Sequence, residues 1–172
     1  NKYASELAEF IVSHARPETG EMTLVIVNQV KRALDLHKKI QKTFLKLDSP
    51  PEIILLHSRF RPADRASAEA KLNTPAGTNG RVVISTQVVE AGVDIDAAIL
   101  VTELAPWSSL VQRFGRCNRY GEVEGGSDVY WIDMDDDPEV TSPYGQEAVR
   151  SARAILQKLD SAGIEALPPV ES

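Results

Sequence analysis

The sequence has little sulfur and no long apolar run. Its single cysteine, Cys117, excludes an internal disulfide and a zinc site built from several cysteines. No apolar stretch approaches the roughly 18 residues that a membrane-spanning helix needs, and no secretory signal pattern opens the chain. We therefore expect a cytoplasmic protein that does not contact a membrane. Because the first residue is Asn1 rather than Met, we also expect the chain to be a piece of a larger protein.

The sequence also lacks the loops that hold a triphosphate or a metal ion in many enzymes. No glycine is followed by lysine, so the Gly-x-x-x-x-Gly-Lys-Ser/Thr phosphate loop is missing, as is an Asp-Glu-x-Asp/His box for magnesium. The three histidines are well separated, which argues against a His-Asp nuclease centre. Residues 133–137 begin like an EF-hand loop, but Pro138 and Tyr144 stand where that loop needs Gly and Glu, so we interpret them as a solvated acidic loop.

Positive charge is scarce overall but unevenly placed. The net charge is −6, yet residues 120–149 hold nine acidic residues and no basic one. Residues 1–119 carry 16 Lys/Arg against 13 Asp/Glu, a surplus of 3 (16 − 13). The first two thirds of the chain can therefore meet phosphates, although so small a surplus does not by itself predict binding.

Short apolar runs alternate with amphipathic stretches along the chain. Near-continuous Val, Ile and Leu is typical of strands in a parallel sheet that is covered on both faces. The expected strands are residues 23–28, 52–57, 81–85, 97–102 and 128–133, and the expected helices are 2–14, 29–47, 62–72, 108–114 and 145–160. This alternation predicts one α/β domain over residues 1–172, a parallel sheet with helices on both faces in a three-layer sandwich. Ligands of such sheets bind beyond the carboxyl ends of the strands.

The strongest motif is QRFGRCNR at residues 112–119, a QRxGRxxR pattern. Arg116 and Arg119 are three residues apart, so on a helix they would share one face. Two guanidinium groups directed at one point suit an anion with planar oxygens, such as a phosphate. A solvated basic helix face is the alternative.

A second motif, STQVVEAGVDID at residues 85–96, begins where an expected strand ends. Ser85 and Thr86 can turn backbone and hydroxyl donors toward a phosphate. Gly92 allows a close backbone turn, and the carboxylate of Asp94 could accept ribose hydroxyls. A β-turn-α connection with a polar cap is the alternative, and this motif alone does not decide between the two.

In this order, separated by a strand and a Pro-Trp turn, the two motifs resemble motifs V and VI of superfamily 2 helicases. Residues 24–30 (LVIVNQV) resemble motif IV, and the likeness covers about residues 22–133. Three short segments are more specific and resemble the type I CRISPR helicase–nuclease family. They are residues 88–96 (VVEAGVDID), 116–122 (RCNRYGE) and 57–60 (HSRF). Phe114 departs from that family, which usually has a small residue at this position.

The resemblance implies the second RecA-like domain, with motifs IV to VI, of an ATP-dependent helicase. ATP would bind between this domain and an absent first RecA-like domain of the same polypeptide, which would hold the triphosphate and Mg²⁺. Carried over by motif, the γ-phosphate contacts are Arg116 and Arg119; the other nucleotide contacts are Gln112, Gly92 and Asp94; and the single-stranded DNA contacts are Thr86, Ser85, Asn28, Ser58 and Arg59. A CRISPR surveillance complex is a further expected partner, and the isolated domain is expected to be inactive.

Other functions also fit this pattern. A DEAD-box RNA helicase or a repair helicase would share the domain, but Gln112 stands where DEAD-box proteins have His. A non-catalytic binding module would need neither the two arginines nor Asp94. An unrelated nucleotide-binding enzyme would need a Gly-rich phosphate loop. Among weaker features, we expect Cys117 and Trp107 to pack, whereas His57 is either structural or a nucleic-acid contact.

Overall fold

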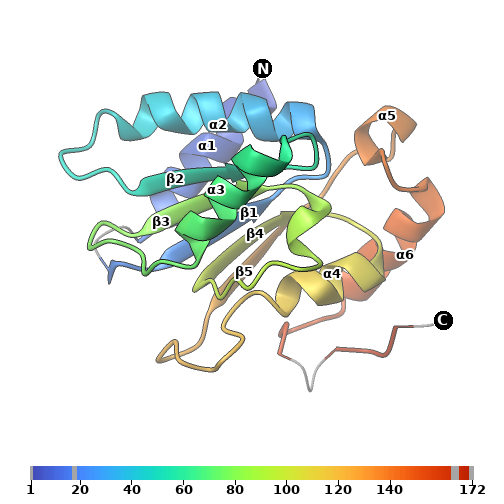
Figure 1. Cartoon of the computed structure of the whole chain (residues 1–172). Coiled ribbons are helices and arrows are strands. Elements are labelled where there is room, and N and C mark those ends of the chain that lie inside the picture. The colour runs from blue at the N-terminus through green and yellow to red at the C-terminus, as the bar shows by residue number, and fades with distance from the viewer. Residues whose placement is uncertain (1, 17–18, 164–166, 171–172) are drawn as a thin grey trace.

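The five apolar runs form the five strands of one sheet. The computed structural model describes residues 2–16, 19–163 and 167–170. The strands are β1 (Met22–Ile26), β2 (Glu52–Leu56), β3 (Arg81–Ser85), β4 (Ile99–Glu103) and β5 (Asp128–Ile132). All pairings are parallel, in the order β2-β3-β1-β4-β5, so the first strand in the sequence lies at the centre of the sheet (Figure 1).

Helices cover both faces of this sheet (Figure 1). On one face lie α1 (Lys2–His14) and α2 (Val30–Phe44), whose apolar residues join one core cluster. On the other face lie α3 (Pro62–Leu72), α4 (Trp107–Phe114) and α6 (Gln146–Leu156), whose apolar residues join a second cluster. The predicted three-layer arrangement is thus confirmed, and the described part contains no helix long and apolar enough to cross a membrane.

The predicted elements agree closely with the observed ones because apolar periodicity and local signals coincide. Helix α3 begins at Pro62, since a proline at the first helical position loses no helical hydrogen bond. Two short elements were not predicted: a 3-10 helix (Gln87–Val89) and α5 (Pro138–Thr141). The start of β4 shifts to Ile99 because Ala97 forms an isolated bridge with Cys117 instead.

The two residues expected to pack do so. Trp107 and Cys117 are each 9% exposed, and Trp107 lies beside Phe114 with its ring nitrogen donating to the carbonyl of Pro168 at 3.2 Å. Burial also raises the pKa of the Cys117 thiol. Both side chains therefore belong to the core that supports the loop carrying the arginines.

Candidate nucleotide and nucleic-acid site

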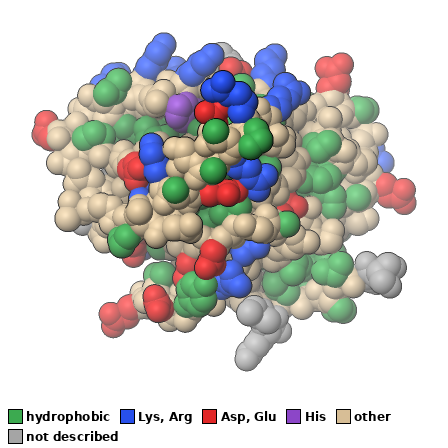
Figure 2. All heavy atoms as spheres, in the orientation of Figure 1, with side chains coloured by type: hydrophobic (Ala, Val, Ile, Leu, Met, Phe, Trp, Pro, Cys, Tyr) green, Lys and Arg blue, Asp and Glu red, His purple; other side chains and the backbone are tan. Residues whose placement is uncertain are grey.

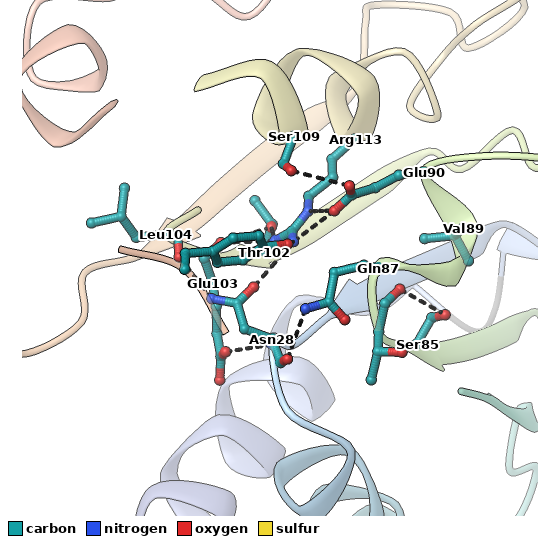
Figure 3. A network of polar contacts seen from close by, with 12 residues as sticks. Asn28, Ser85, Gln87, Val89, Glu90, Thr102, Glu103, Leu104, Ser109 and Arg113 are labelled. Atoms are coloured by element: carbon teal, nitrogen blue, oxygen red, sulfur yellow. Dashed lines mark hydrogen bonds and ion pairs between the residues drawn. The ribbon is translucent and has the colours of Figure 1, made fainter. Parts of the chain in front are cut away.

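A fully buried arginine lies at the centre of the candidate site. Arg113, in the last turn of α4, is 0% exposed and is directed at the carboxyl ends of β1 and β4 (Figure 3). Its Nε and Nη2 lie 2.9 Å and 2.8 Å from Oε1 of Glu90. The other contacts run from Nη1 to Thr102 Oγ1 (2.8 Å) and Glu103 O (3.1 Å), and from Nη2 to Asn28 Oδ1 and Tyr144 Oη (both 3.1 Å). One guanidinium thus connects β1, β4, α4, the 87–90 segment and the loop before α6.

A buried carboxylate lies beside it. Glu103, at the end of β4, is 0% exposed and accepts hydrogen bonds from Tyr3 Oη and the backbone N–H of Asn28, both at 2.6 Å. Arg32 of α2 donates to the same carboxylate at 2.8 Å. Burial and the neighbouring carboxylate raise the pKa of Tyr3 far above its ordinary value. Tyr3 therefore remains protonated and ties α1 to the end of β4.

Arg116 binds backbone rather than side chains. Its Nε and Nη2 donate to the carbonyl oxygens of Val89 and Glu90, each at 3.0 Å. Gln87, earlier in the same segment, donates to the carbonyl of Asn28 at 2.9 Å (Figure 3). The start of the second motif is therefore fixed from both sides, by Arg113 and Arg116 of the first motif and by the end of β1.

The exposed part of the site is a pair of opposite charges. Arg119 Nη1 lies 2.9 Å from Oδ1 of Asp94, and their side chains are 44% and 66% exposed. Tyr120 Oη donates to the same carboxylate at 3.1 Å, while Asp96 accepts from the backbone N–H of Arg119 at 2.7 Å. The two motifs are thus in contact, as expected. The Arg119–Asp94 pair, however, lies next to Asp96 and Ala97, just before the amino end of β4, and not beyond the carboxyl ends of the strands where the sequence placed the site.

Arg116 and Arg119 lie beyond the helix, so the shared face that their spacing would give on a helix does not form. Helix α4 ends at Phe114, and Asn118 has a positive φ of 48°, so both arginines lie in an irregular loop. Gly115 follows the helix directly, where it favours termination. Consequently the two guanidinium groups bind different partners in this structure.

The remaining nucleotide candidates are accessible. Gln112 is exposed on α4, and Gly92 is exposed in the loop that leads to Asp94. Gly92 has a φ of +79°, a conformation that only glycine adopts without strain. Among the described residues no group of three His, Cys, Asp or Glu side chains is placed to hold a metal ion.

The five nucleic-acid candidates divide into two groups. Asn28 and Ser85 are buried, and their side chains are used internally: Asn28 Nδ2 donates to Leu104 O at 2.8 Å, and Ser85 Oγ donates to Leu56 O at 2.9 Å. Contrary to expectation, neither presents a free polar group at the surface. Ser58 and Arg59 are exposed after β2, and the buried hydroxyl of Thr86 has no partner within the described protein.

His57 belongs with the buried group. It is 6% exposed, lies edge-on to Phe60 with ring centroids 4.1 Å apart, and accepts a hydrogen bond from the backbone N–H of Arg59 at Nδ1 (3.2 Å). Burial lowers its pKa. The structural interpretation therefore fits His57, which shapes the turn that presents Ser58 and Arg59.

Part of the positive surplus lies on one helix. Figure 2 shows Lys and Arg side chains gathered along the edge of the molecule over α2. The exposed lysines of this helix and of the turn after it are Lys31, Lys38, Lys39, Lys42 and Lys46.

Comparison with known proteins identifies the domain. A sequence model described as the C-terminal part of the CRISPR-associated nuclease/helicase Cas3 matches residues 19–122. The chain belongs to the Cas3 C-terminal family. The Cas3 nuclease/helicase of Methanothermobacter thermautotrophicus is 33% identical over 141 residues, which is 80% of this chain and 16% of that protein. The chain therefore spans less than a fifth of this relative.

Solved structures show the RecA-like helicase fold. The crystal structure of T. fusca Cas3 matches with a TM-score of 0.75 at 23% identity, over 92% of this chain and 20% of that one. The structure of T. fusca Cas3 with AMPPNP matches with a TM-score of 0.74 at 22% identity, over 88% of this chain and 20% of that one. A chain of a CRISPR RNA-guided surveillance complex matches with a TM-score of 0.68 at 22% identity, over the same shares of the two chains. The second domain of the Mss116p DEAD-box helicase bound to an RNA duplex matches with a TM-score of 0.56 at 18% identity, over 78% of this chain and 50% of that one. Membership in the Cas3 family separates this helicase domain from the DEAD-box alternative.

Proposed function

We propose that the chain is the second motor domain of an ATP-dependent Cas3-type helicase that moves along single-stranded DNA. ATP would bind between the exposed edge around Asp94 and Arg119 and the first RecA-like domain of the same polypeptide. The observation that carries this proposal is the contact between the two motifs, in which Arg119 pairs with Asp94 in solvent while Arg113 and Arg116 bind Glu90.

The accessible groups fit one side of a nucleotide. Arg119 carries donors suited to phosphate oxygens, and Asp94 carries acceptors suited to ribose hydroxyls. Gln112 and the backbone at Gly92 lie exposed in the same two motifs. Because the described residues offer no cluster of carboxylates for a divalent ion, we assign Mg²⁺ and most of the triphosphate to the first domain.

The two arginines take different roles in this proposal. Arg119 exchanges Asp94 for the γ-phosphate when the domains close, and it then stabilises the charge that develops on the transferred phosphoryl oxygens. The bound nucleotide supplies the phosphoanhydride that is cleaved. Arg116 begins from the carbonyl oxygens of Val89 and Glu90, so its approach to the phosphate requires those two bonds to be released.

The nucleic-acid contacts in this proposal come mainly from Ser58 and Arg59, whose side chains are exposed. Ser58 and Arg59 would meet phosphates of a single strand. The unpaired hydroxyl of Thr86 is fully buried, so it would donate to a phosphate only after the segment around it moved. Asn28 and Ser85 would act indirectly by fixing the ends of β1 and β3. A CRISPR surveillance complex would deliver the DNA to the whole enzyme.

Substitution of Arg119 in the enzyme that contains this chain tests the proposal. Arg119→Ala should lower ATP turnover by about 10³–10⁵-fold, the contribution of an arginine finger in other NTPases. Arg119→Lys should be nearly as damaging, because an ammonium cannot reproduce the planar contact. The melting temperature should stay unchanged, since the side chain is nearly half exposed.

Arg61 provides the matched control. It also pairs with an aspartate, Asp64, and its side chain is 84% exposed, but it lies outside both motifs. Arg61→Ala should leave turnover and melting temperature as they are. If Arg119→Ala keeps more than about a tenth of the turnover, Arg119 does not stabilise the transition state. Unchanged turnover in every variant would favour a non-catalytic binding module.

A further inference from the structure

Strand β5 is exposed in a way that the central strands of the sheet are not. All residues of β3 and β4 are buried, whereas all five residues of β5 are only partly buried. Within the described part of the chain β5 pairs with β4 alone, so its outer edge is open. An open edge presents unpaired backbone N–H and C=O groups to whatever lies beside it.

A hollow of about 610 Å³ follows this edge. Its walls are Tyr3, Glu6, Leu7 and Phe10 of α1 together with Val129, Tyr130, Trp131 and Ile132 of β5. Successive residues of a strand point to opposite faces of the sheet. Four consecutive residues therefore line the hollow with side chains of both faces or with the backbone of the open edge, as expected of a hollow that follows the edge of the strand.

The hollow is apolar along its length and charged at its ends. Glu6 is its only charged lining residue, and Glu6 already pairs with Lys2 at 3.5 Å. The ion pair Arg16–Asp128 marks one end of β5, and the pair Arg153–Asp133, at 2.7 Å, lies just beyond the other. The four lining residues of the strand extend over about 13 Å at 3.3 Å per residue. The site thus fits a short extended segment with apolar side chains.

We propose that an extended apolar segment of the same polypeptide, outside these 172 residues, pairs with β5 as a sixth strand and packs onto α1. This rests on the proposed function only in taking the domain to be part of a longer enzyme. The domain spans 16% of its M. thermautotrophicus relative and 20% of the T. fusca Cas3 chain, so proteins of this family have ample sequence to supply the segment. A tethered segment binds at a high effective concentration, and an uncovered apolar edge is one that natural proteins protect.

The proposed strand would also touch the support of the candidate site. Tyr3 lines the hollow and donates its hydroxyl hydrogen to Glu103 at 2.6 Å. Glu103 in turn binds the backbone N–H of Asn28 and the side chain of Arg32. The added strand would therefore steady α1 and, through Tyr3, the carboxyl ends of β1 and β4.

Thiol labelling in the whole enzyme tests the pairing. Val129→Cys places a thiol in the hollow, and Ser49→Cys, in the exposed turn before β2 at the opposite end of the sheet order, is the control. Reaction with a maleimide, read by mass spectrometry of the peptide, should be at least about tenfold slower for Val129→Cys in the enzyme than in the 172-residue chain, since covered sites react only through opening. The control should react at equal rates in both.

Hydrogen exchange gives a second measurement that needs no substitution. In the whole enzyme the amides of β5 should exchange as slowly as those of β4, because both would lie inside the sheet. Equal labelling in the two proteins, or fast exchange of β5 in the enzyme, would overturn the proposal. If the β5 amides of the 172-residue chain become protected as its concentration rises, the proposal would also be overturned. In that case a second copy of the chain, and not a segment of the same polypeptide, would pair with β5. ATP turnover of the Val129→Cys enzyme is measured in parallel, so failure of the motor proposal is detected separately.

Discussion

Replacing Arg113 by methionine should cost the domain a large share of its stability. Methionine nearly preserves the length of the side chain but removes the charge and all five N–H donors. Glu90, whose side chain is 12% exposed, would lose its ionic partner and keep only the hydroxyl of Ser109 at 3.1 Å. The Oδ1 of Asn28 and the hydroxyl of Thr102 would each lose a partner as well.

The size of the loss follows from the burial of these groups. Breaking a buried ion pair by removing one partner costs about 3–5 kcal/mol, because the other charge remains in a poorly solvated place. For a domain of this size each kcal/mol lowers the melting temperature by about 2–4 °C, so the expected drop is roughly 6–20 °C. Folded domains are typically stable by about 5–15 kcal/mol, so such a loss would remove from about a fifth to nearly all of that stability.

Urea unfolding followed by circular dichroism measures the effect in the 172-residue chain. Arg61→Met is the matched control, and its midpoint should not move because the Arg61–Asp64 pair is exposed. Adding Glu90→Gln to Arg113→Met should recover at least about 1 kcal/mol, since the unpaired carboxylate would then be neutral. If Arg113→Met unfolds within about 1 kcal/mol of the unaltered chain, the guanidinium does not support the site.

Three further predictions follow from the same structure. The isolated chain should show no steady ATP hydrolysis. It should bind single-stranded DNA weakly and with a shallow salt dependence, because a surplus of 3 positive charges over residues 1–119 neutralises few phosphates. Tight binding that depends steeply on salt would contradict this. Burial lowers the pKa of His57, so below about pH 6.5 the unfolded chain binds more protons than the folded one. The contribution of the neutral His57 ring to the free energy of unfolding is therefore complete above that pH and is lost as the pH falls. In the His57→Gln variant the urea midpoint should change less between pH 7 and 5 than in the unaltered chain. An equally steep change of the midpoint with pH would exclude this role. Gly92→Ala should destabilise the domain by about 1–2 kcal/mol, since its φ of +79° places a Cβ in the left-handed region; an unchanged midpoint would show that the loop readily changes conformation.

The sheet was predictable because its determinants are local. Four strands are short runs rich in Val, Ile and Leu between polar turns, and β5 adds Tyr130 and Trp131 to Val129 and Ile132. Helix α3 begins at Pro62. These signals are contained within a few residues, and the observed bounds of the strands differ from the predicted ones by two residues at most. The 3-10 helix and α5 escaped prediction because neither is long enough to show a periodic pattern.

The site was predictable in outline but not in its supports. The contact between Arg113 and Glu90 lies at the carboxyl ends of the strands, where the rule for parallel sheets places a site. The Arg119–Asp94 pair lies beside the amino end of β4 and did not follow from that rule. The role of Arg113 did not follow, because a charged side chain is read from sequence as exposed unless its partners are known. Those partners, among them Asn28 and Tyr144, come from segments 85 and 31 residues away. The helix ends at residue 114 as predicted, but the path of the loop that carries Arg116 and Arg119, with Asn118 at a φ of 48°, could not be predicted from the spacing of the arginines.

The central position of β1 has a consequence for synthesis on the ribosome. Strand β1 ends at Ile26, and its first possible sheet partner, β3, begins at Arg81, 55 residues later (81 − 26). At 5–20 residues per second, roughly 3 to 11 s pass between the two. During that interval β1, four of whose five residues are buried in the folded domain, has no neighbouring strand, and only the amphipathic faces of α1 and α2 can cover it. We expect nascent chains arrested before Arg81 to bind chaperones that recognise extended apolar segments, and chains that extend past β4 to release them.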